Sequence, residues 1–288
     1  MVTISHVYFH TKCRIIRIFL FFISLRVLEK AVSFIGTLRL YNHYGLNKKL
    51  NTLFKDKIVY SGPFKGMIYP DFFSFGSALY SKLTGCYESE LHTVIEDFLT
   101  QKYDTIIDIG CAEGYYAVGM ALRQPQAKVY AIDIEEKALA GCNKMAKLNN
   151  VADRVITSNY CNTEILAGMI SGRTLIISDC EGYEIELFTE SSRNIFAYCD
   201  VLIELHDYVD IDISGTLKSV FQATHTVHNY YSMSDAQKYS LQRSKFGFEI
   251  LKNFDKRTEY QAITDLRKEA IEWLVCKSRE CKYPSYAD

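Results

Sequence analysis

Short apolar runs alternate with helix-like segments between residues 105 and 205, and this alternation constrains the fold more than any other feature of the chain. The apolar runs are continuous, which is typical of strands buried on both faces of a sheet. Strands joined by helices form βαβ units, so the sequence predicts a parallel sheet with helices on both faces. The predicted strands cover residues 105–109, 128–133, 154–158, 174–179 and 200–205.

The chain extends this pattern at both ends. Before residue 105, two β-prone runs flank Gly62-Pro63 and predict a hairpin over 57–70, and residues 88–101 have the apolar spacing of a helix. Late in the chain, about forty charged and partly helical residues separate the last two predicted strands. An insertion of that size beside a sheet usually carries function. The remaining helices are predicted over 115–123, 135–148, 165–170, 183–189 and 214–221, and the last two strands over 224–230 and 271–277.

The first 50 residues are predicted to be helical and cationic, with an uncharged apolar run at 18–25 between Arg17 and Arg26. This run is far shorter than the roughly 20 residues that span a bilayer. No small-residue cleavage site follows it at the expected distance, which weighs against a signal peptide. Two interpretations stay open. The segment is either an amphipathic helix on a membrane surface, or a helix that packs on the domain or on a second subunit of a homodimer.

The net charge of −1 weighs against a nucleic-acid partner, because such a protein must neutralise phosphates and usually shows a basic stripe. We therefore expect a small molecule or a glycan as substrate.

The nine cysteines include no Cys-x-x-Cys pair, which weighs against a zinc site or a disulfide framework. Buried, reduced thiols are typical of a cytoplasmic protein, and the expected location is the cytoplasm, either free or at the inner membrane surface.

A glycine-containing turn, Asp-Ile-Gly-Cys-Ala-Glu-Gly at 108–114, joins the first predicted strand to the next helix. Gly110 and Gly114 allow a tight turn and a close approach of the backbone to a ligand, and the following helix N-terminus favours negative charge. Asp133 ends the next strand, where an acidic side chain can accept hydrogen bonds from ribose hydroxyls. The spacing differs from the dinucleotide-binding motif, Gly-x-Gly-x-x-Gly.

This spacing resembles the first motif of class I S-adenosylmethionine-dependent methyltransferases, Asp-x-Gly-x-x-x-Gly. The resemblance implies a Rossmann-like class I methyltransferase fold: a mostly parallel seven-stranded sheet with helices on both faces and a final antiparallel strand. It also implies S-adenosylmethionine as cofactor. Asp108 would reach the amino group at the methionine end of the cofactor, the backbone of 110–114 would contact the same end, and Asp133 would hold the ribose.

The loop after the third strand touches the adenine in related folds, so Tyr160 or Asn162 is expected beside that ring. A further resemblance, described next, adds Glu88. The complete set of expected cofactor contacts is Glu88, Asp108, Gly110, Cys111, Ala112, Gly114, Tyr115, Asp133, Ile134, Tyr160, Asn162 and Asp179.

Acidic residues follow the fourth and fifth strands, at the sheet edge where open α/β sheets bind ligands. The sequence Asp-Cys-Glu-Gly-Tyr-Glu at 179–184 resembles the Asp-x-Glu-Gly-x-Glu motif of FkbM-type methyltransferases, and residues 204–206 and 272–274 resemble two other stretches of that family. The resemblance covers about 100–280. It implies methylation of oxygen on sugars, polyketides or related secondary metabolites. A Tyr-Glu pair can border the cofactor pocket in this family, which points to Glu88.

Methyl transfer to a hydroxyl requires the acceptor to be positioned and its proton to be removed. His206, with an ordinary pKa of about 6.5, could act as the base, and Asp179 or Glu204 could replace it or orient its ring. With Glu181, these form the set of catalytic candidates. Asp179, Glu204 and His206 are also candidate ligands for Mg²⁺. The structural alternative for His206 is a histidine that is simply hydrogen-bonded at a strand end.

Two other functions stay open. One is methylation of nitrogen on protein or nucleic acid, although such enzymes often carry Asn/Asp-Pro-Pro-Tyr after the fourth strand, where this chain has Asp-Cys-Glu-Gly. The other is a degenerate methyltransferase fold that serves as a binding module.

The predicted organisation is an N-terminal helical extension at 1–56, a hairpin and helix at 57–100, and the methyltransferase domain at 101–288.

Overall fold

The computed structural model describes residues 47–207, 212–245, 250–267 and 270–280, all within one compact unit, Tyr44–Asp288. The predicted extension at 1–56, with its apolar run at 18–25, lies almost wholly outside these residues. Its contact with a membrane or a second subunit therefore stays a prediction, as do the boundaries at 57–100 and 101–288. Within the described ranges, no helix is both long and apolar enough to cross a membrane.

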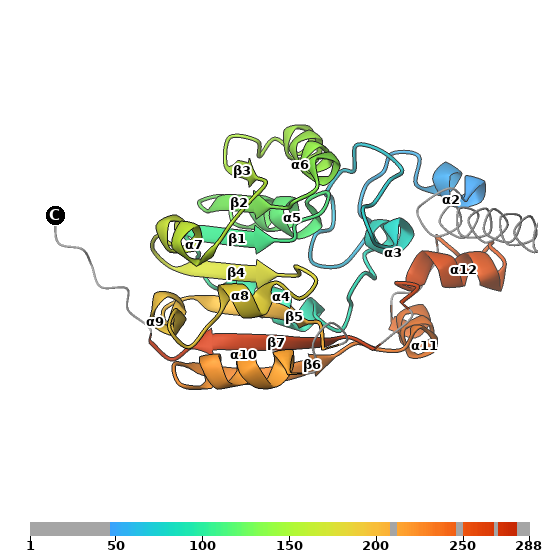
Figure 1. Ribbon diagram of the computed structural model, residues 1–288. Helices are drawn as coiled ribbons and strands as arrows, with labels where there is room; N and C mark the ends of the chain where they lie inside the picture. Colours follow the sequence, from blue (N-terminus) through green and yellow to red (C-terminus); the bar gives the residue numbers. More distant parts are fainter. Residues whose placement is uncertain (1–46, 208–211, 246–249, 268–269, 281–288) are drawn as a thin grey trace, which may run out of the picture. The chain divides into compact units, whose positions relative to one another are not determined.

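The described chain forms a seven-stranded sheet in the order β3-β2-β1-β4-β5-β7-β6 (Figure 1). Every neighbouring pair from β3 to β5 is parallel, whereas β7 pairs antiparallel with both β5 and β6. The predicted Rossmann-like class I methyltransferase fold, with its antiparallel final strand, is therefore confirmed. The strands are β1 (Thr105–Ile109), β2 (Lys128–Ile132), β3 (Val155–Ser158), β4 (Thr174–Ser178), β5 (Asp200–Leu205), β6 (His225–Tyr231) and β7 (Glu272–Ser278).

Two layers of helices cover the sheet, because successive residues of a buried strand point to opposite faces. Ile106 packs into one hydrophobic cluster, and its neighbour Ile107 packs into the other. Figure 1 shows α7, α8 and α10 in front of the sheet, and α4 and α5 behind it. The rear layer contains α4 (His92–Thr100), α5 (Tyr115–Arg123) and α6 (Glu136–Leu148), and the front layer α7 (Thr163–Met169), α8 (Glu184–Leu187), α9 (Arg193–Phe196) and α10 (Ile213–Gln222).

Within the part of the chain that the structure describes, four more helices belong to segments outside the alternating core. They are α2 (Lys48–Leu53), α3 (Leu79–Thr84), α11 (Asp235–Lys245) and α12 (Lys256–Ile263). The last two come from the insertion between β6 and β7, and α12 packs against both α3 and α11. In Figure 1, α3, α11 and α12 lie to the right, on the side where the arrows of β1 and β4 end. The early segment and the late insertion therefore meet at the carboxyl edge of the sheet.

The sequence-based predictions hold for the strands and fail in part near the site. The hairpin over 57–70 is reduced to one antiparallel bridge, Ile58↔Ile68. The helix predicted from residue 88 begins at His92, because Glu88 has a φ of 45°, which a right-handed helix cannot contain. The helix predicted over 183–189 spans only Glu184–Leu187. The short helices α3 and α9 were not predicted.

Gly110 joins the loop after β1 to the loop after β4. Its φ is 79°, and a Cβ atom added there would lie 1.7 Å from the carbonyl oxygen of Asp179. The amide of Asp179 in turn donates to the carbonyl oxygen of Ile109 at 2.8 Å. The two loops are thus in direct backbone contact, and only glycine fits between them.

We predict that Gly110→Ala destabilises the protein by about 3 kcal/mol or more, because the new methyl group meets both a left-handed backbone and a fixed carbonyl. Gly168→Ala is the matched control, since nothing lies within 4 Å of its added Cβ and the residue is exposed on α7. That control should stabilise the protein by up to about 1 kcal/mol. Urea unfolding measures both effects, and equal midpoints for Gly110→Ala and wild type would contradict the prediction.

Candidate active site

The loop after β1 and the end of β2 are held together by one carboxylate. Asp133 accepts hydrogen bonds from the backbone amide of Ala112 to Oδ2 and from that of Glu135 to Oδ1, both at 2.8 Å. Ala112 has a φ of 47°, a left-handed conformation that favours glycine. Asp133 therefore stabilises an uncommon backbone turn at the position where the sequence predicts the ribose.

Asp108 is the second acidic residue of this edge, and only 3% of its surface is exposed. Burial, together with the charges of Asp179 and Asp133, raises its pKa to about 8, although a backbone amide from Ala117 opposes the shift. Its Oδ2 atom is buried and has no hydrogen-bond partner within the described part of the chain. A buried carboxylate oxygen without a donor fits the amino group of S-adenosylmethionine, which would supply one.

The other expected cofactor residues fall into two groups. Ile134 and Tyr160 are 82% and 55% exposed, so their side chains are available for contact with an adenine ring. Asn162 uses its side-chain oxygen to cap α7 through the amide of Ile165. Cys111 and Tyr115 are buried in the hydrophobic core, which leaves only their backbone for the predicted contact. The cofactor roles of these residues stay predictions.

The structure brings the four catalytic candidates together at the carboxyl ends of β4 and β5. The Nε2 atom of His206 lies 3.4 Å from Oδ1 of Asp179, 3.8 Å from Oε2 of Glu181 and 3.8 Å from Oε1 of Glu204. His206 itself is 1% exposed, whereas the side chain of Asp179 is 39% exposed. A ligand at this edge would therefore meet Asp179 before it met the histidine ring.

Glu184 also belongs to the cluster. No role for this residue was predicted from the sequence. Its fully buried Oε1 lies 3.0 Å from Nδ1 of His206 and also accepts a hydrogen bond from the amide of Cys180 at 3.0 Å. The available signal was its place at the end of the Asp-x-Glu-Gly-x-Glu stretch. That position becomes the first turn of α8, so the side chain turns back under the loop.

The carboxylates change the chemistry expected of His206. Burial alone would lower its pKa, but contacts with Asp179 and Glu184 outweigh burial and raise the pKa to about 10. A pKa of about 10 favours the protonated ring at neutral pH, and the role of His206 as the base stays a prediction. Burial, with the charge of Asp179, also raises the pKa of Glu204 well above its usual value. Asp179 and Glu181, whose side chains are 39% and 76% exposed, are thus the members of the cluster that could accept a proton from a ligand.

Glu88, Asp265 and Arg267 form a buried wall beside this cluster. Both carboxylate oxygens of Glu88 are engaged, one by the hydroxyl of Tyr116 and the other by the guanidinium of Arg267. Asp265 accepts from the ammonium of Lys238 on α11. The insertion therefore contributes to the wall of the site, whereas the prediction that Glu88 contacts the cofactor has not been tested.

Backbone strain is concentrated at the site. Six non-glycine residues in the described ranges have a positive φ, and four of them belong to the loops discussed here: Glu88, Ala112, Glu181 and Leu266. Such conformations are unfavourable and persist where the surrounding structure enforces them, which is common at ligand-binding sites.

A divalent cation could be held by donors of the same cluster. Asp179, Glu181 and His206 each offer one ligand atom, and these atoms lie within 4.8 Å of one another. Carboxylate oxygens suit Mg²⁺, and an imidazole nitrogen suits transition metals better. Glu181 replaces the expected Glu204 in this group. The use of Mg²⁺ stays a prediction.

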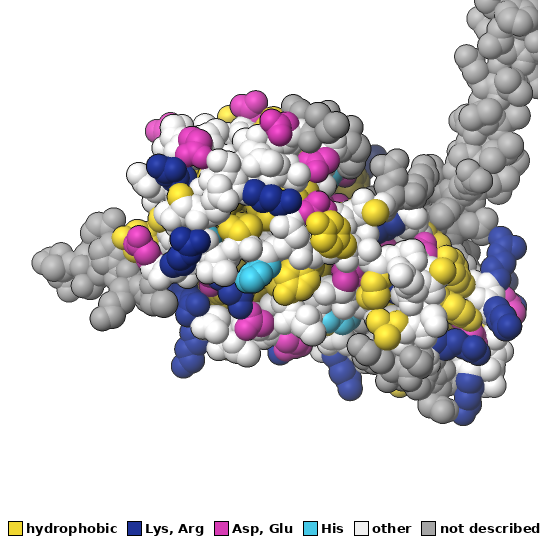
Figure 2. All heavy atoms as spheres, turned by 90° about the horizontal axis from the view of Figure 1, so that it is seen from below, with side chains coloured by type: hydrophobic (Ala, Val, Ile, Leu, Met, Phe, Trp, Pro, Cys, Tyr) yellow, Lys and Arg dark blue, Asp and Glu magenta, His cyan; other side chains and the backbone are white. Residues whose placement is uncertain are grey.

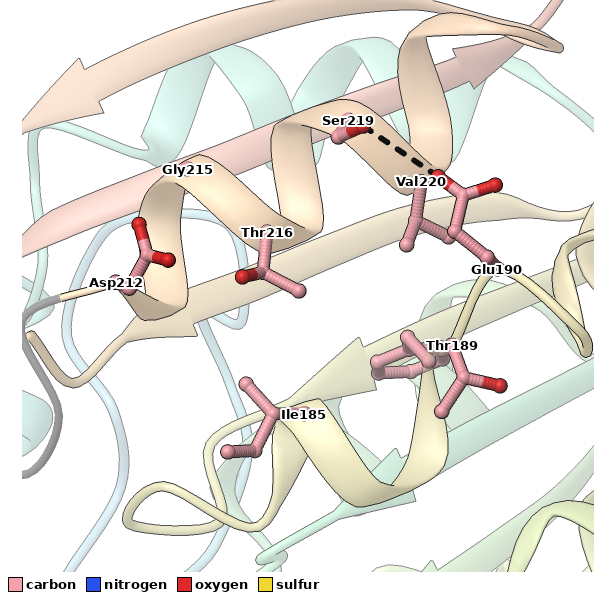
Figure 3. Close-up of a pocket in the computed structure, with 9 residues that line it drawn as sticks. Ile185, Thr189, Glu190, Asp212, Gly215, Thr216, Ser219 and Val220 are labelled. Carbon is pink, nitrogen blue, oxygen red and sulfur yellow. Dashed lines mark hydrogen bonds between the residues drawn. The ribbon is translucent and has the colours of Figure 1, made fainter.

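A separate pocket of about 540 Å³ lies between α8 and α10, away from the cofactor loop (Figure 3). Ile185 and Val220 give it an apolar side, and Thr216, Ser219 and Glu190 a polar one. Ser219 donates to Glu190 across the pocket at 3.4 Å. None of the sequence-predicted site residues lines it.

The sequence is similar to known methyltransferases over part of its length. Residues 100–165 match the family model described as a methyltransferase domain. The release factor glutamine methyltransferase of Flavobacterium psychrophilum is 44% identical over 61 residues, which are 21% of each chain. The ribosomal RNA large subunit methyltransferase G of Photobacterium profundum is 38% identical over 68 residues, which are 24% of this chain and 17% of that protein. The chain thus covers about a fifth of these relatives' length.

Two solved structures are similar to this chain at low sequence identity. The geranyl diphosphate C-methyltransferase of Streptomyces coelicolor is 13% identical, with a TM-score of 0.41, and the match covers 67% of this chain and 79% of that one. The precorrin-6y C5,15-methyltransferase of Geobacter metallireducens is also 13% identical, with a TM-score of 0.41 and coverage of 65% and 89%.

The sheet order and the matched region define the class of this protein. Residues 100–165 match a methyltransferase domain, and the described residues have the sheet order of the class I fold. Such a domain implies S-adenosylmethionine as methyl donor.

We predict that binding of S-adenosylhomocysteine at pH 7 releases up to about one proton, because Asp108 is mostly neutral below its raised pKa and must ionise to pair with the ligand's ammonium group. Affinity should therefore increase as the pH rises from 7 toward 8. Calorimetry in two buffers of different ionisation enthalpy measures the released proton. Asp108→Asn should abolish the buffer dependence, and a wild-type enthalpy that is the same in both buffers would contradict the assignment.

Proposed function

We propose that this protein is an FkbM-type enzyme that transfers a methyl group from S-adenosylmethionine to a hydroxyl of a sugar, glycan or secondary metabolite. The observation that carries the proposal is the contact between Gly110 and the carbonyl of Asp179. It joins the predicted cofactor loop to the acid–histidine cluster, so a cofactor and an acceptor would meet at one edge of the sheet. The resemblance of residues 179–184 and 204–206 to the FkbM motifs supports the acceptor class.

The chain's own residues can perform the proton chemistry of such a reaction. Bound S-adenosylmethionine supplies an electrophilic methyl group. The exposed carboxylate of Asp179 can accept the hydroxyl proton of the acceptor, and the ring of His206, whose Nε2 atom lies 3.4 Å away, can orient that carboxylate. Glu184 holds that ring from the buried side at 3.0 Å. In this arrangement His206 acts on the acceptor through Asp179 rather than as the base itself.

Methylation of nitrogen is the second candidate. The two sequence relatives described above, from Flavobacterium psychrophilum and Photobacterium profundum, are named for glutamine and ribosomal RNA methylation. Two observations favour oxygen. The loop after β4 reads Asp-Cys-Glu-Gly and lacks the Pro-Pro pair common among amino-methylating enzymes. On the face shown in Figure 2, basic and acidic side chains are interspersed, whereas RNA binding favours a basic stripe.

Cofactor binding is the first test. Calorimetric titration should show that S-adenosylhomocysteine binds to the wild-type protein, and that Asp133→Ala weakens binding on the order of 10–100-fold through loss of a charge-assisted contact. Asp153→Ala is the matched control, since that side chain is 74% exposed and lies in a turn before β3. Absence of binding to well-folded wild-type protein would favour the degenerate binding module instead.

The metal is tested separately. If the cluster holds a divalent cation, Mn²⁺ should bind to the wild-type protein with a changed paramagnetic resonance spectrum, and Asp179→Asn should weaken this binding at least about 10-fold, because one charged oxygen ligand is lost. Asp153→Ala again serves as the control. Failure of Mn²⁺ to bind in the presence of S-adenosylhomocysteine would remove the metal from the proposal.

The acceptor is best found by comparing the metabolites and glycans of the source organism with those of a deletion strain. The proposed function predicts a product that is replaced by a compound lighter by one methylene group. A change confined to methylated RNA or protein would instead support the nitrogen candidate.

A further inference from the structure

Glu113, inside the predicted cofactor loop, binds a segment that precedes the sheet. Its carboxylate is buried, with 4% of the residue exposed, and it accepts four hydrogen bonds. The ammonium of Lys82 and the hydroxyl of Ser74 each donate to Oε1 at 2.7 Å, and the hydroxyl of Tyr69 donates to the same atom at 3.2 Å. The amide of Phe75 donates to Oε2 at 2.8 Å.

Every one of these donors comes from residues 69–82, before the region that matches the methyltransferase domain. The matched region, 100–165, contains Glu113 itself. The chain therefore fixes the middle of its cofactor loop with a segment that the matched domain does not include. No role for Glu113, Lys82 or Ser74 was predicted from the sequence.

Lys82 is the central cation of this arrangement. It is 3% exposed, and it donates to Ser74 at 3.0 Å as well as to Glu113. Its ammonium also lies 4.8 Å from the ring centre of Tyr87 and 5.2 Å from that of Tyr115. Tyr115 is the first residue of α5, and Tyr87 precedes the wall residue Glu88. One buried cation thus contacts the cofactor loop, the helix that follows it and the edge of the acceptor site.

Glu113 lies within the 110–114 loop, so contacts to its side chain restrain the backbone of that loop. Ala112 and Gly114 on either side of it have positive φ angles of 47° and 96°. The conformation of Ala112 is unfavourable and persists where surrounding contacts enforce it, whereas glycine adopts the φ of Gly114 readily. The hydrogen bonds to Glu113 are among these contacts, together with the bond from the amide of Ala112 to Asp133.

We propose that Glu113 and Lys82, with Ser74, form a clamp that holds the 110–114 loop in its cofactor-binding conformation. They are positioning residues, since they act through the loop and not by touching the cofactor. The inference rests on the proposed function, because the loop must bind S-adenosylmethionine for the clamp to matter. It makes the segment 69–82 a functional part of the cofactor site.

The charge balance supports a role beyond packing. Burial raises the pKa of Glu113, but Lys82 outweighs this effect and lowers it, so the carboxylate is ionised at neutral pH. A buried ion pair is often no better for stability than an apolar pair of similar volume, so stability alone explains its presence poorly. Fixing one conformation of a strained loop is a role that apolar packing does not fill as well, because it lacks directional hydrogen bonds.

The test measures the affinity for S-adenosylhomocysteine by calorimetry and the melting temperature of the full chain. Lys82→Met and Glu113→Gln should each raise Kd on the order of 10-fold. Ser74→Ala, which leaves both charges in place, should raise it by about 3-fold and guards against a Lys82 variant that does not fold. Hydrogen–deuterium exchange should accelerate at the amides of 110–116 in all three variants.

Tyr103→Phe is the matched control. Its hydroxyl donates to Oδ2 of Asp200 at 2.7 Å within the core at the opposite, amino-terminal edge of the parallel strands. This variant should lower the melting temperature while leaving Kd within twofold of wild type. Clamp variants that melt lower but bind with wild-type Kd would overturn the inference and leave the proposed function intact. A folded wild-type protein that does not bind the ligand would overturn both.

Discussion

The site depends on one backbone contact, in which the Gly110 backbone lies against the carbonyl oxygen of Asp179 with no room for a side chain. β1 pairs with β2 on one side and β4 on the other, so the chain changes direction across the sheet at this point. In open α/β sheets, ligands bind beyond the carboxyl ends of the strands at such a place. The contact brings the loop after β1 and the loop after β4 together, and the remaining features of the site are arranged around these two loops.

Several charged side chains near the site are buried and paired. Glu184, Glu113, Glu88 and Lys238 are almost fully buried, and each has a partner of opposite charge. Removing such groups from water is unfavourable unless they are paired and hydrogen-bonded. All four pairs lie at the carboxyl edge of the sheet or next to it, where they fix loops rather than strands. The strands are packed mainly by apolar side chains, and buried Asp200 at the start of β5 pairs with Arg173.

Acidic residues at the carboxyl edge of the sheet differ in exposure and therefore in the role that each can take. Asp179 and Glu184 both lie against His206, yet one is well exposed and the other fully buried. Their separation makes the ring a bridge between the interior and the open side of the site. The sequence presents His206 as a possible base, whereas its surroundings in the fold raise its pKa to about 10. The difference arises because several carboxylates converge on it from two loops.

The sequence predicted the sheet well. Continuous apolar runs such as 105–109 and 200–205 become strands at the predicted residues, because a strand buried on both faces leaves an unambiguous pattern. Asp108, Gly110 and Asp133 were predicted to share one edge, and they do, since the carboxyl ends of parallel strands always meet. The short helix α3 and the late start of α4 were missed, because their boundaries follow from Gly85 and Glu88 in left-handed conformations. Those conformations are set by neighbours that are distant in the chain.

By itself, the sequence determined the order of the strands, most of the helices between them and the nature of the groups at the strand ends. These follow from local pattern: burial on two faces, glycine at tight turns and acidic residues after strands. Only the tertiary structure decided what those groups do. The pKa of His206, the partners of Glu113 and the wall built by Glu88 and Arg267 each depend on side chains brought together from separate segments, and the electrostatic environment of a group exists only once those segments have folded around it.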